Sequence, residues 1–209
     1  MTPIVFLDLE TTGLDPQLDH ILQIAIQVVD GETIEPIGEP FVSDVALTEA
    51  AAGRLYMNPF VRDMHRKTGL LDRLESAISD PGQPDRGPYG LDRTQGATLA
   101  FLRARGLLPR EGALPRRPTL TLAGNSVHFD LAFLRTHMPR LAAMFSHRLL
   151  DVSVLRMFED RWGSGEIAVE NTLEHDALAD VRSSIEQLRR YVARRSLLGQ
   201  FAADAGYRS

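Results

Sequence analysis

The stretch that decides the fold is Ile4-Val5-Phe6-Leu7-Asp8-Leu9-Glu10-Thr11-Thr12-Gly13-Leu14, close to the start of the chain. Its first six residues are typical of a buried strand, in which residues two apart point to the same face. Asp8 and Glu10 therefore project side by side from the core of a sheet. Two such carboxylates repel each other unless a cation lies between them, and hard divalent ions such as Mg2+ or Mn2+ prefer oxygen ligands. Taken alone, a D-x-E pair favours the simpler interpretation, a strand end whose acids are solvated.

The composition restricts the class of protein. With 209 residues and 44% hydrophobic content, the chain can bury a proper core, and we expect a single domain over residues 1–209. It contains neither a run of about 20 apolar residues nor a leader pattern, which predicts a cytoplasmic protein without a membrane partner. The absence of cysteine restricts any metal site to oxygen or histidine ligands. A net charge of -5 argues against coating of long duplexes but allows a small nucleic-acid site.

Hydrophobic periodicity predicts an α/β fold: a mixed sheet with three antiparallel strands at its start, flanked by helices. The predicted strands are residues 4–9, 21–29, 33–41, 119–123 and 149–154. The predicted helices are two or three between 47 and 78, then 94–105, 126–137, a short one from 139, one ending at 162, and a long one over 176–198. In the last helix, Val181, Ile185, Leu188 and Val192 have core spacing. A Pro-, Gly- and Arg-rich insertion is expected around 79–118.

Three further residues in apolar surroundings can join the first two acids. Asp130 lies a few residues into the helix that follows Gly124-Asn125-Ser126, and Asp180 lies on the apolar face of the last helix. His175 precedes Asp180 by five residues, about 140° away on a helix, so we place it on the approach to that helix. Each has an ordinary structural explanation by itself. Together, four acids and one histidine match the requirements of two adjacent divalent cations.

The motifs resemble those of the DEDDh exonucleases of the ribonuclease H-like fold, and the local sequence is similar to the oligoribonuclease family. The motifs that carry the resemblance are Asp8-Leu9-Glu10, Asp130, His175 to Asp180, Gly124-Asn125-Ser126, Met138-Pro139-Arg140-Leu141, Arg148-Leu149-Leu150-Asp151-Val152-Ser153 and Arg161-Trp162. The resemblance covers residues 3 to 192 and fails mainly across 79–118.

The resemblance implies a 3'-5' exoribonuclease that hydrolyses very short RNA, chiefly diribonucleotides, to nucleoside 5'-monophosphates by two-metal-ion catalysis. It assigns the two ions, Mg2+ or Mn2+, to four acids: Asp8, Glu10, Asp130 and Asp180. It assigns the general base to His175, and an imidazole with an ordinary pKa of about 6.5 suits that task at neutral pH. The expected partner is short single-stranded RNA, with short DNA as a further substrate.

The same resemblance assigns substrate-binding residues. Ser126, Arg148 and Ser153 fall on positions that cap the 5' phosphate of a two-nucleotide substrate. Leu14 matches an apolar wedge between the two bases, and Phe60 with His65 is expected to stack nearby, although core packing is an equal alternative for the two apolar residues. The family completes its site with a tyrosine of the partner subunit, where this chain has His147. We expect a homodimer, with an altered contact at His147.

Two other functions remain open at this point. The first is a DEDDh exonuclease of the proofreading or ribonuclease T type, which acts on longer single-stranded DNA or RNA. Arg110, Arg116 and Arg117 of the insertion are candidates for the basic track that such an enzyme needs. The second is a nucleic-acid-binding module without catalysis, and the presence of all five catalytic groups argues against it.

Overall fold

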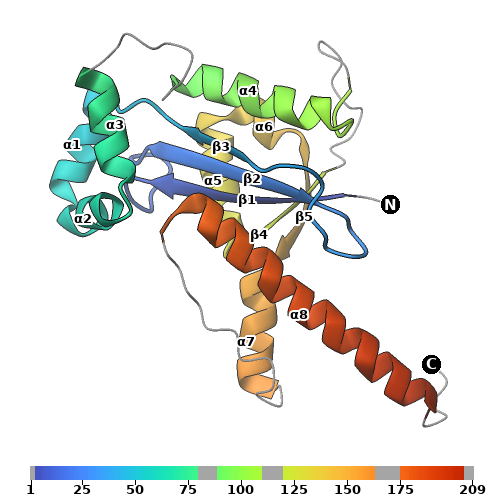
Figure 1. Cartoon of the computed structure of the whole chain (residues 1–209). Helices are drawn as coiled ribbons and strands as arrows, with labels where there is room; N and C mark the ends of the chain where they lie inside the picture. Colours follow the sequence, from blue (N-terminus) through green and yellow to red (C-terminus); the bar gives the residue numbers. More distant parts are fainter. Residues whose placement is uncertain (1–2, 80–88, 110–119, 163–174, 205–209) are drawn as a thin grey trace.

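One five-stranded sheet organises the chain in the computed structural model, which describes residues 3–79, 89–109, 120–162 and 175–204 (Figure 1). The strands are β1 (Ile4–Thr11), β2 (Ile21–Val29), β3 (Phe41–Asp44), β4 (Leu120–Gly124) and β5 (Phe145–Asp151). Their order is β3-β2-β1-β4-β5. β1 is antiparallel to β2, and β2 to β3, whereas β1 and β4 are parallel, as are β4 and β5. The predicted mixed sheet with an antiparallel start is therefore confirmed.

Helices cover both faces of this sheet. They are α1 (Glu49–Met57), α2 (Pro59–Lys67), α3 (Leu70–Ser79), α4 (Leu91–Ala104), α5 (His128–His137), α6 (Pro139–Ala142), α7 (Val152–Trp162) and α8 (Ala177–Asp204). α4, α5 and α6 pack on one face, and α7 and the first half of α8 pack on the other (Figure 1). In the part of the chain described by the structure, no helix combines the length and apolar character that crossing a membrane requires.

The side chains of β1 alternate between the two faces. Val5 and Leu7 belong to the cluster under α4 to α6, while Ile4 and Phe6 belong to the cluster under α7 and α8. The even-numbered series continues into the acids at positions 8 and 10. Both carboxylates therefore leave the sheet on the α8 side, as the strand period predicts.

A glycine sets the distance between β1 and β4. A Cβ atom built at Gly124, the last residue of β4, would lie 2.8 Å from the carbonyl oxygen of Leu7. A Cβ atom cannot lie so close to a carbonyl oxygen without displacement of one backbone. The absence of a side chain at position 124 therefore allows the end of β4 to lie against β1, next to the acids.

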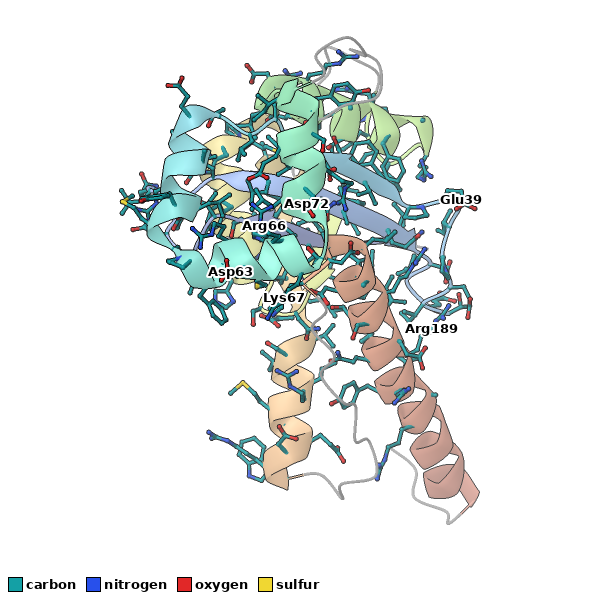
Figure 2. All side chains as sticks on the ribbon, turned by 60° about the vertical axis from the view of Figure 1, so that its left-hand side comes forward. Glu39, Asp63, Arg66, Lys67, Asp72 and Arg189 are labelled. Atoms are coloured by element: carbon teal, nitrogen blue, oxygen red, sulfur yellow. The ribbon has the colours of Figure 1, made fainter. Side chains whose placement is uncertain are left out.

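α1, α2 and α3 form a separate cluster of helices beside the end of β1. Arg66 of α2 pairs with Asp72 at 2.8 Å and with Glu75 at 3.0 Å, both from α3, and Figure 2 shows Arg66 and Asp72 near each other on this surface. The side chain of Asn58 accepts a hydrogen bond from Val61 N and caps the start of α2. These contacts hold α2 in place next to the strand that carries the acids.

The third and fifth strands differ from the prediction. Residues 33–40 form only an isolated bridge between Val29 and Pro36, and β3 begins at Phe41, where the predicted strand ends. Proline lacks the N–H that a ladder needs, and Pro36 and Pro40 both fall in this segment. Instead, Arg189 of α8 holds the segment through Ile34 O at 3.1 Å and Glu35 at 2.6 Å.

β5 spans 145–151 rather than 149–154, and Val152 already begins α7. Its middle residues, Ser146 to Arg148, are polar because β5 is an edge strand with an exposed face, so they lack the apolar signal of a strand. Val192 is also a correction, because 37% of it is exposed and it does not join the core of α8. In the predicted insertion, α4 packs on the sheet, while 80–88 and 110–118 lie outside the described residues.

Candidate active site

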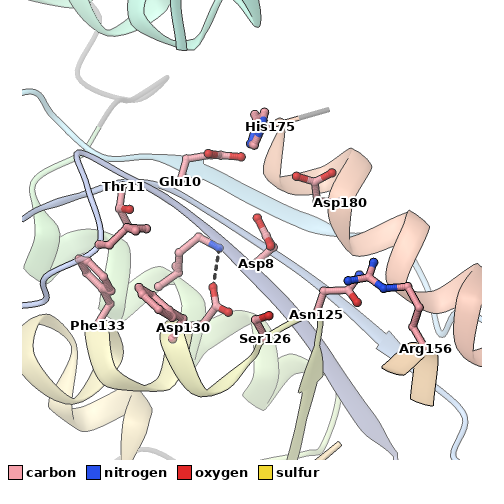
Figure 3. A pocket seen from close by; sticks show the side chains of 13 residues that line it. Asp8, Glu10, Thr11, Asn125, Ser126, Asp130, Phe133, Arg156, His175 and Asp180 are labelled. Carbon is pink, nitrogen blue, oxygen red and sulfur yellow. Dashed lines mark hydrogen bonds between the residues drawn. The ribbon is translucent and has the colours of Figure 1, made fainter. Parts of the chain in front are cut away.

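A pocket of about 230 Å3 opens where β1 and β4 end. It contains all five predicted catalytic groups, which come from β1, α5 and the start of α8 (Figure 3). Its lining residues are Asp8, Leu9, Glu10, Thr11, Leu14, Asn125, Ser126, Phe129, Asp130, Phe133, Arg156, His175 and Asp180. Residues more than 100 positions apart in the sequence thus meet at one edge of the sheet.

Three of the acids form a compact set of oxygen ligands. Asp8, Glu10 and Asp180 each offer a carboxylate oxygen within 4.8 Å of the other two. Glu10 and Asp180 are almost fully buried, so solvent cannot screen their charges well. A group of anionic oxygens at this spacing suits a hard divalent cation.

The fourth acid approaches from the opposite face of the sheet. Asp130 lies in the first turn of α5 and is buried, and its Oδ1 accepts a hydrogen bond of 2.9 Å from Leu9 N. That amide belongs to the residue between the two acids of β1. The hydrogen bond therefore holds the Asp130 carboxylate next to Asp8 and Glu10 (Figure 3).

The start of α8 is attached to β2. Gln23 pairs with Glu10 across the antiparallel ladder, and its Oε1 accepts a hydrogen bond of 3.3 Å from Ala177 N, in the first turn of the helix. Asp176 accepts a hydrogen bond of 3.0 Å from Ala179 N and thereby caps the helix. Because the helix begins at a defined place, Asp180 one turn later reaches the acids of β1.

The raised pKa values of the acids indicate that grouping their charges is unfavourable without a cation. Burial, followed by the nearby carboxylates of Asp180, Asp176 and Asp130, raises the pKa of Glu10 from 4.5 to about 8. Burial and then the charge of Asp130 raise the pKa of Asp8 well above its usual value. Burial also raises the pKa of Asp130, against the lowering effect of the Leu9 amide. A bound divalent cation would favour the ionised forms instead, so the donor set fits a metal site.

His175 lies before α8, as the sequence predicts, and its side chain lies beside Glu10 and Asp180 (Figure 3). Its backbone has a φ of 54°, in the left-handed region, and Ser126 has a φ of 51°. Non-glycine residues adopt this conformation at a cost of about 1 kcal/mol or more, and such residues gather at functional sites. Two of them line this one pocket.

Among the predicted substrate-binding residues, Leu14 and Ser126 line the pocket. Leu14 is 75% exposed and Phe60, at the start of α2, is 77% exposed, so core packing does not explain either residue. Phe60 lies outside the pocket, and so do Arg148 and His147, both exposed on β5.

Asp151 connects two of the predicted cap residues. Its Oδ1 accepts hydrogen bonds from Ser126 N at 3.0 Å, from Ser153 N at 3.0 Å and from Ser153 Oγ at 2.6 Å. Asp151 belongs to one of the sequence motifs, but no role was predicted for it. A carboxylate at a strand end, followed by a serine two residues later, is the signal of an Asx-type turn that could have identified it.

The stacking role expected for His65 is not compatible with its position and is corrected here. The side chain is fully buried, and its Nε2 donates a hydrogen bond of 2.8 Å to the carbonyl oxygen of Thr11. Its Nδ1 lies 3.7 Å from Oε2 of Glu10. A ring enclosed between α2 and β1 offers no face to a base, so His65 supports the strand that carries Glu10.

Several lining residues were not foreseen. They had no predicted role and are Thr11, Asn125, Phe129, Phe133 and Arg156. Arginines are common on helix surfaces, so no sequence signal distinguished Arg156 from the others. Arg110, Arg116 and Arg117, the candidates for a basic track, lie outside the described residues.

Comparisons with known proteins identify relatives among exonucleases. The model of the exonuclease family matches residues 5–73. An oligoribonuclease of Alkalilimnicola ehrlichii is 33% identical over 97% of this chain and 94% of its own length. An oligoribonuclease of Thiobacillus denitrificans is 34% identical over 91% of this chain and 93% of its own.

The fold also has counterparts among solved structures. The E. coli exonuclease I complex with single-stranded DNA superposes with a TM-score of 0.57 at 19% identity, over 98% of this chain and 43% of that one. This chain thus spans less than half of that larger protein, and the likeness concerns the fold alone. It confirms the ribonuclease H-like architecture expected from the sequence.

Proposed function

Because the chain belongs to the oligoribonuclease family, it is a metal-dependent 3'-5' exoribonuclease, and we propose that its main substrates are diribonucleotides, which it converts to nucleoside 5'-monophosphates. The observation that carries this proposal is the cluster of four acids with His175 in one small pocket. A pocket of about 230 Å3 favours a short substrate over a long strand.

We assign two divalent ions, Mg2+ or Mn2+, to Asp8, Glu10, Asp130 and Asp180. The all-oxygen donor set and the raised pKa of Glu10, about 8, support this assignment. Bound at this place, such ions activate water and neutralise the charge that develops on the phosphate and the leaving oxygen. The chain itself contributes the spacing of the carboxylates, which the β1 ladder and the start of α8 hold in place.

His175 is proposed to accept the proton of the attacking water. Its side chain lines the pocket beside Glu10 and Asp180, and it is only partly buried, so a proton can pass on to solvent. Leu14 is proposed to separate the two bases, and its 75% exposure at the pocket supports contact with a ligand. Ser126 and Ser153, connected through Asp151, are proposed to bind the 5' phosphate.

We further propose a homodimer of single-domain subunits in the cytoplasm. A row of apolar side chains on one face of α7 supports the dimer: Val154, Met157, Phe158 and Trp162, each more than half exposed. In such a dimer, Arg148 and His147 of β5 are candidates to complete the neighbouring subunit's site, because both are exposed and lie outside their own pocket.

A length series tests the function. The substrates are 5'-phosphorylated RNA and DNA of two to seven nucleotides, with Mn2+ or Mg2+ present and nucleoside monophosphate release measured. We expect kcat/KM for the diribonucleotide to exceed that for the heptamer RNA at least tenfold, which corresponds to about 1.4 kcal/mol in the barrier. The Asp8→Ala variant is the control and should remain folded without hydrolysing any member. Equal rates at all lengths would favour the alternative, an exonuclease for longer strands.

A further inference from the structure

One cation of the pocket has no assigned role. Within the described residues, Arg156 of α7 is the only arginine or lysine that lines the pocket. The arginine expected to bind phosphate, Arg148, lies outside it. A pocket lined by four acids would repel a phosphodiester unless cations are present, so the position of a single guanidinium matters for substrate binding.

Arg156 is half-buried, and one buried nitrogen of its guanidinium has no hydrogen bond. Its Nη1 has no exposed surface of note and no hydrogen-bond partner among the described residues. The side chain extends toward Asn125, at the end of β4 (Figure 3). Asn125 in turn donates a hydrogen bond of 2.8 Å to Ser184 Oγ on α8, while its own Oδ1 has no partner. A buried donor without a partner is costly, which indicates a place for an acceptor that binds from the pocket.

Arg156 lies at one end of the pocket. In Figure 3 its guanidinium is next to Asn125, on the side of the pocket away from Glu10 and Thr11. Arg156 also acts at the contact between α7 and α8, since its charge lowers the pKa of Tyr191, against the opposite effects of burial and of nearby acids. The guanidinium thus lies at the end of the pocket where β4 ends.

We propose that Arg156 binds the 5'-terminal phosphate of the dinucleotide substrate through its guanidinium and thereby selects for 5'-phosphorylated ends. This inference rests on the proposed function, which places the scissile phosphate at the acids and the 5' end at Ser126. Guanidinium groups bind phosphate oxygens through paired N–H donors, and such charge-assisted bonds are about twice as strong as neutral ones. The neighbouring Ser126 hydroxyl can donate to the same group.

Binding without turnover tests the proposal. Dissociation constants of two diribonucleotides, one with a 5' phosphate and one with a 5' hydroxyl, are measured with Ca2+ in place of Mg2+. We expect Arg156→Met to raise the dissociation constant of the 5'-phosphorylated ligand at least tenfold. The constant of the 5'-hydroxyl ligand should rise less than threefold. Arg156→Lys should retain part of the difference. Arg161→Met is the matched control, since Arg161 is exposed on the same helix and does not line the pocket, and it should change neither constant.

The outcomes separate this inference from the proposed function. If Arg156 only supports the α7–α8 contact, Arg156→Met will lower the melting temperature. It will then raise both dissociation constants by the same factor or leave both unchanged, and the proposal is wrong. A wild-type protein that prefers the phosphorylated ligand through Arg156 but hydrolyses nothing in the length series would contradict the function and retain the inference. Wild-type protein that binds neither dinucleotide would overturn both.

Discussion

Replacing Glu10 with glutamine should stabilise the metal-free protein at alkaline pH. The Glu10 pKa rises from 4.5 to about 8 on folding, first through burial and then through Asp180, Asp176 and Asp130. A folded state with a raised carboxyl pKa binds more protons than the unfolded state, so its stability falls as pH increases between the two pKa values. The penalty is absent well below pH 4.5 and complete above about pH 8. Glutamine resembles the protonated acid and does not carry this penalty.

The size of the effect follows from the same shift. At 1.36 kcal/mol per pKa unit, the full penalty is about 5 kcal/mol, and at pH 8, where half of the folded protein is protonated at Glu10, it is about 4 kcal/mol. At pH 5 it is below about 1 kcal/mol. Relaxation of the pocket and coupling among the acids reduce these figures, and we expect a gain in unfolding free energy of at least about 2 kcal/mol for Glu10→Gln at pH 8.

Urea unfolding in EDTA at pH 5 and pH 8 measures this gain. Glu39→Gln serves as the control because Glu39 is an exposed acid far from the pocket, and it should change stability little at either pH. Adding Mn2+ at pH 8 should reverse the order of stability, since the variant lacks one carboxylate ligand. Equal stability of wild type and Glu10→Gln at pH 8 in EDTA would refute the electrostatic description of the pocket.

Two further predictions concern the cap and the dimer. Asp151→Ala removes the acceptor of three hydrogen bonds around Ser126 and Ser153 and should raise KM for the 5'-phosphorylated diribonucleotide about tenfold, whereas Asp151→Asn retains an acceptor and should change KM less. Unchanged KM in both variants would show that the cap does not depend on Asp151. Phe158→Glu places a charge in the apolar row of α7 and should convert a dimer into monomers in sedimentation equilibrium, and a dimer that persists would exclude this face.

The central part of the site was predictable because its signals are local. The alternation of Ile4 to Leu9 places the first two acids on one face, and the five-residue spacing of His175 and Asp180 places His175 before the helix that carries Asp180. Each acid also interrupts an apolar sequence, which is unusual enough to be noticed. These expectations depend only on neighbours along the chain, and the structure agrees with them.

What the sequence did not reveal depends on contacts between distant segments. The imidazole ring of His65 is of a type that can stack on a base. The packing of α2 against β1, however, buries this ring beside Glu10. Arg156 lines the pocket from α7, which begins at Val152. The predicted strand 149–154 would have delayed the start of this helix by three residues and so gave no indication of this position. Pro36 and Pro40 prevent a strand over most of the predicted range 33–41, so the third strand begins only at Phe41.

The close approach at Gly124 has a consequence for how this site can vary. The position of Asp130 relative to β1 is set by two main-chain contacts, the Leu7 carbonyl against Gly124 and the Leu9 amide on the carboxylate. These two contacts act on the separation of the acids in addition to the core side chains of α5. A single methyl group at position 124 would push β4 away from β1 and carry α5, with its carboxylate, out of range of the metal.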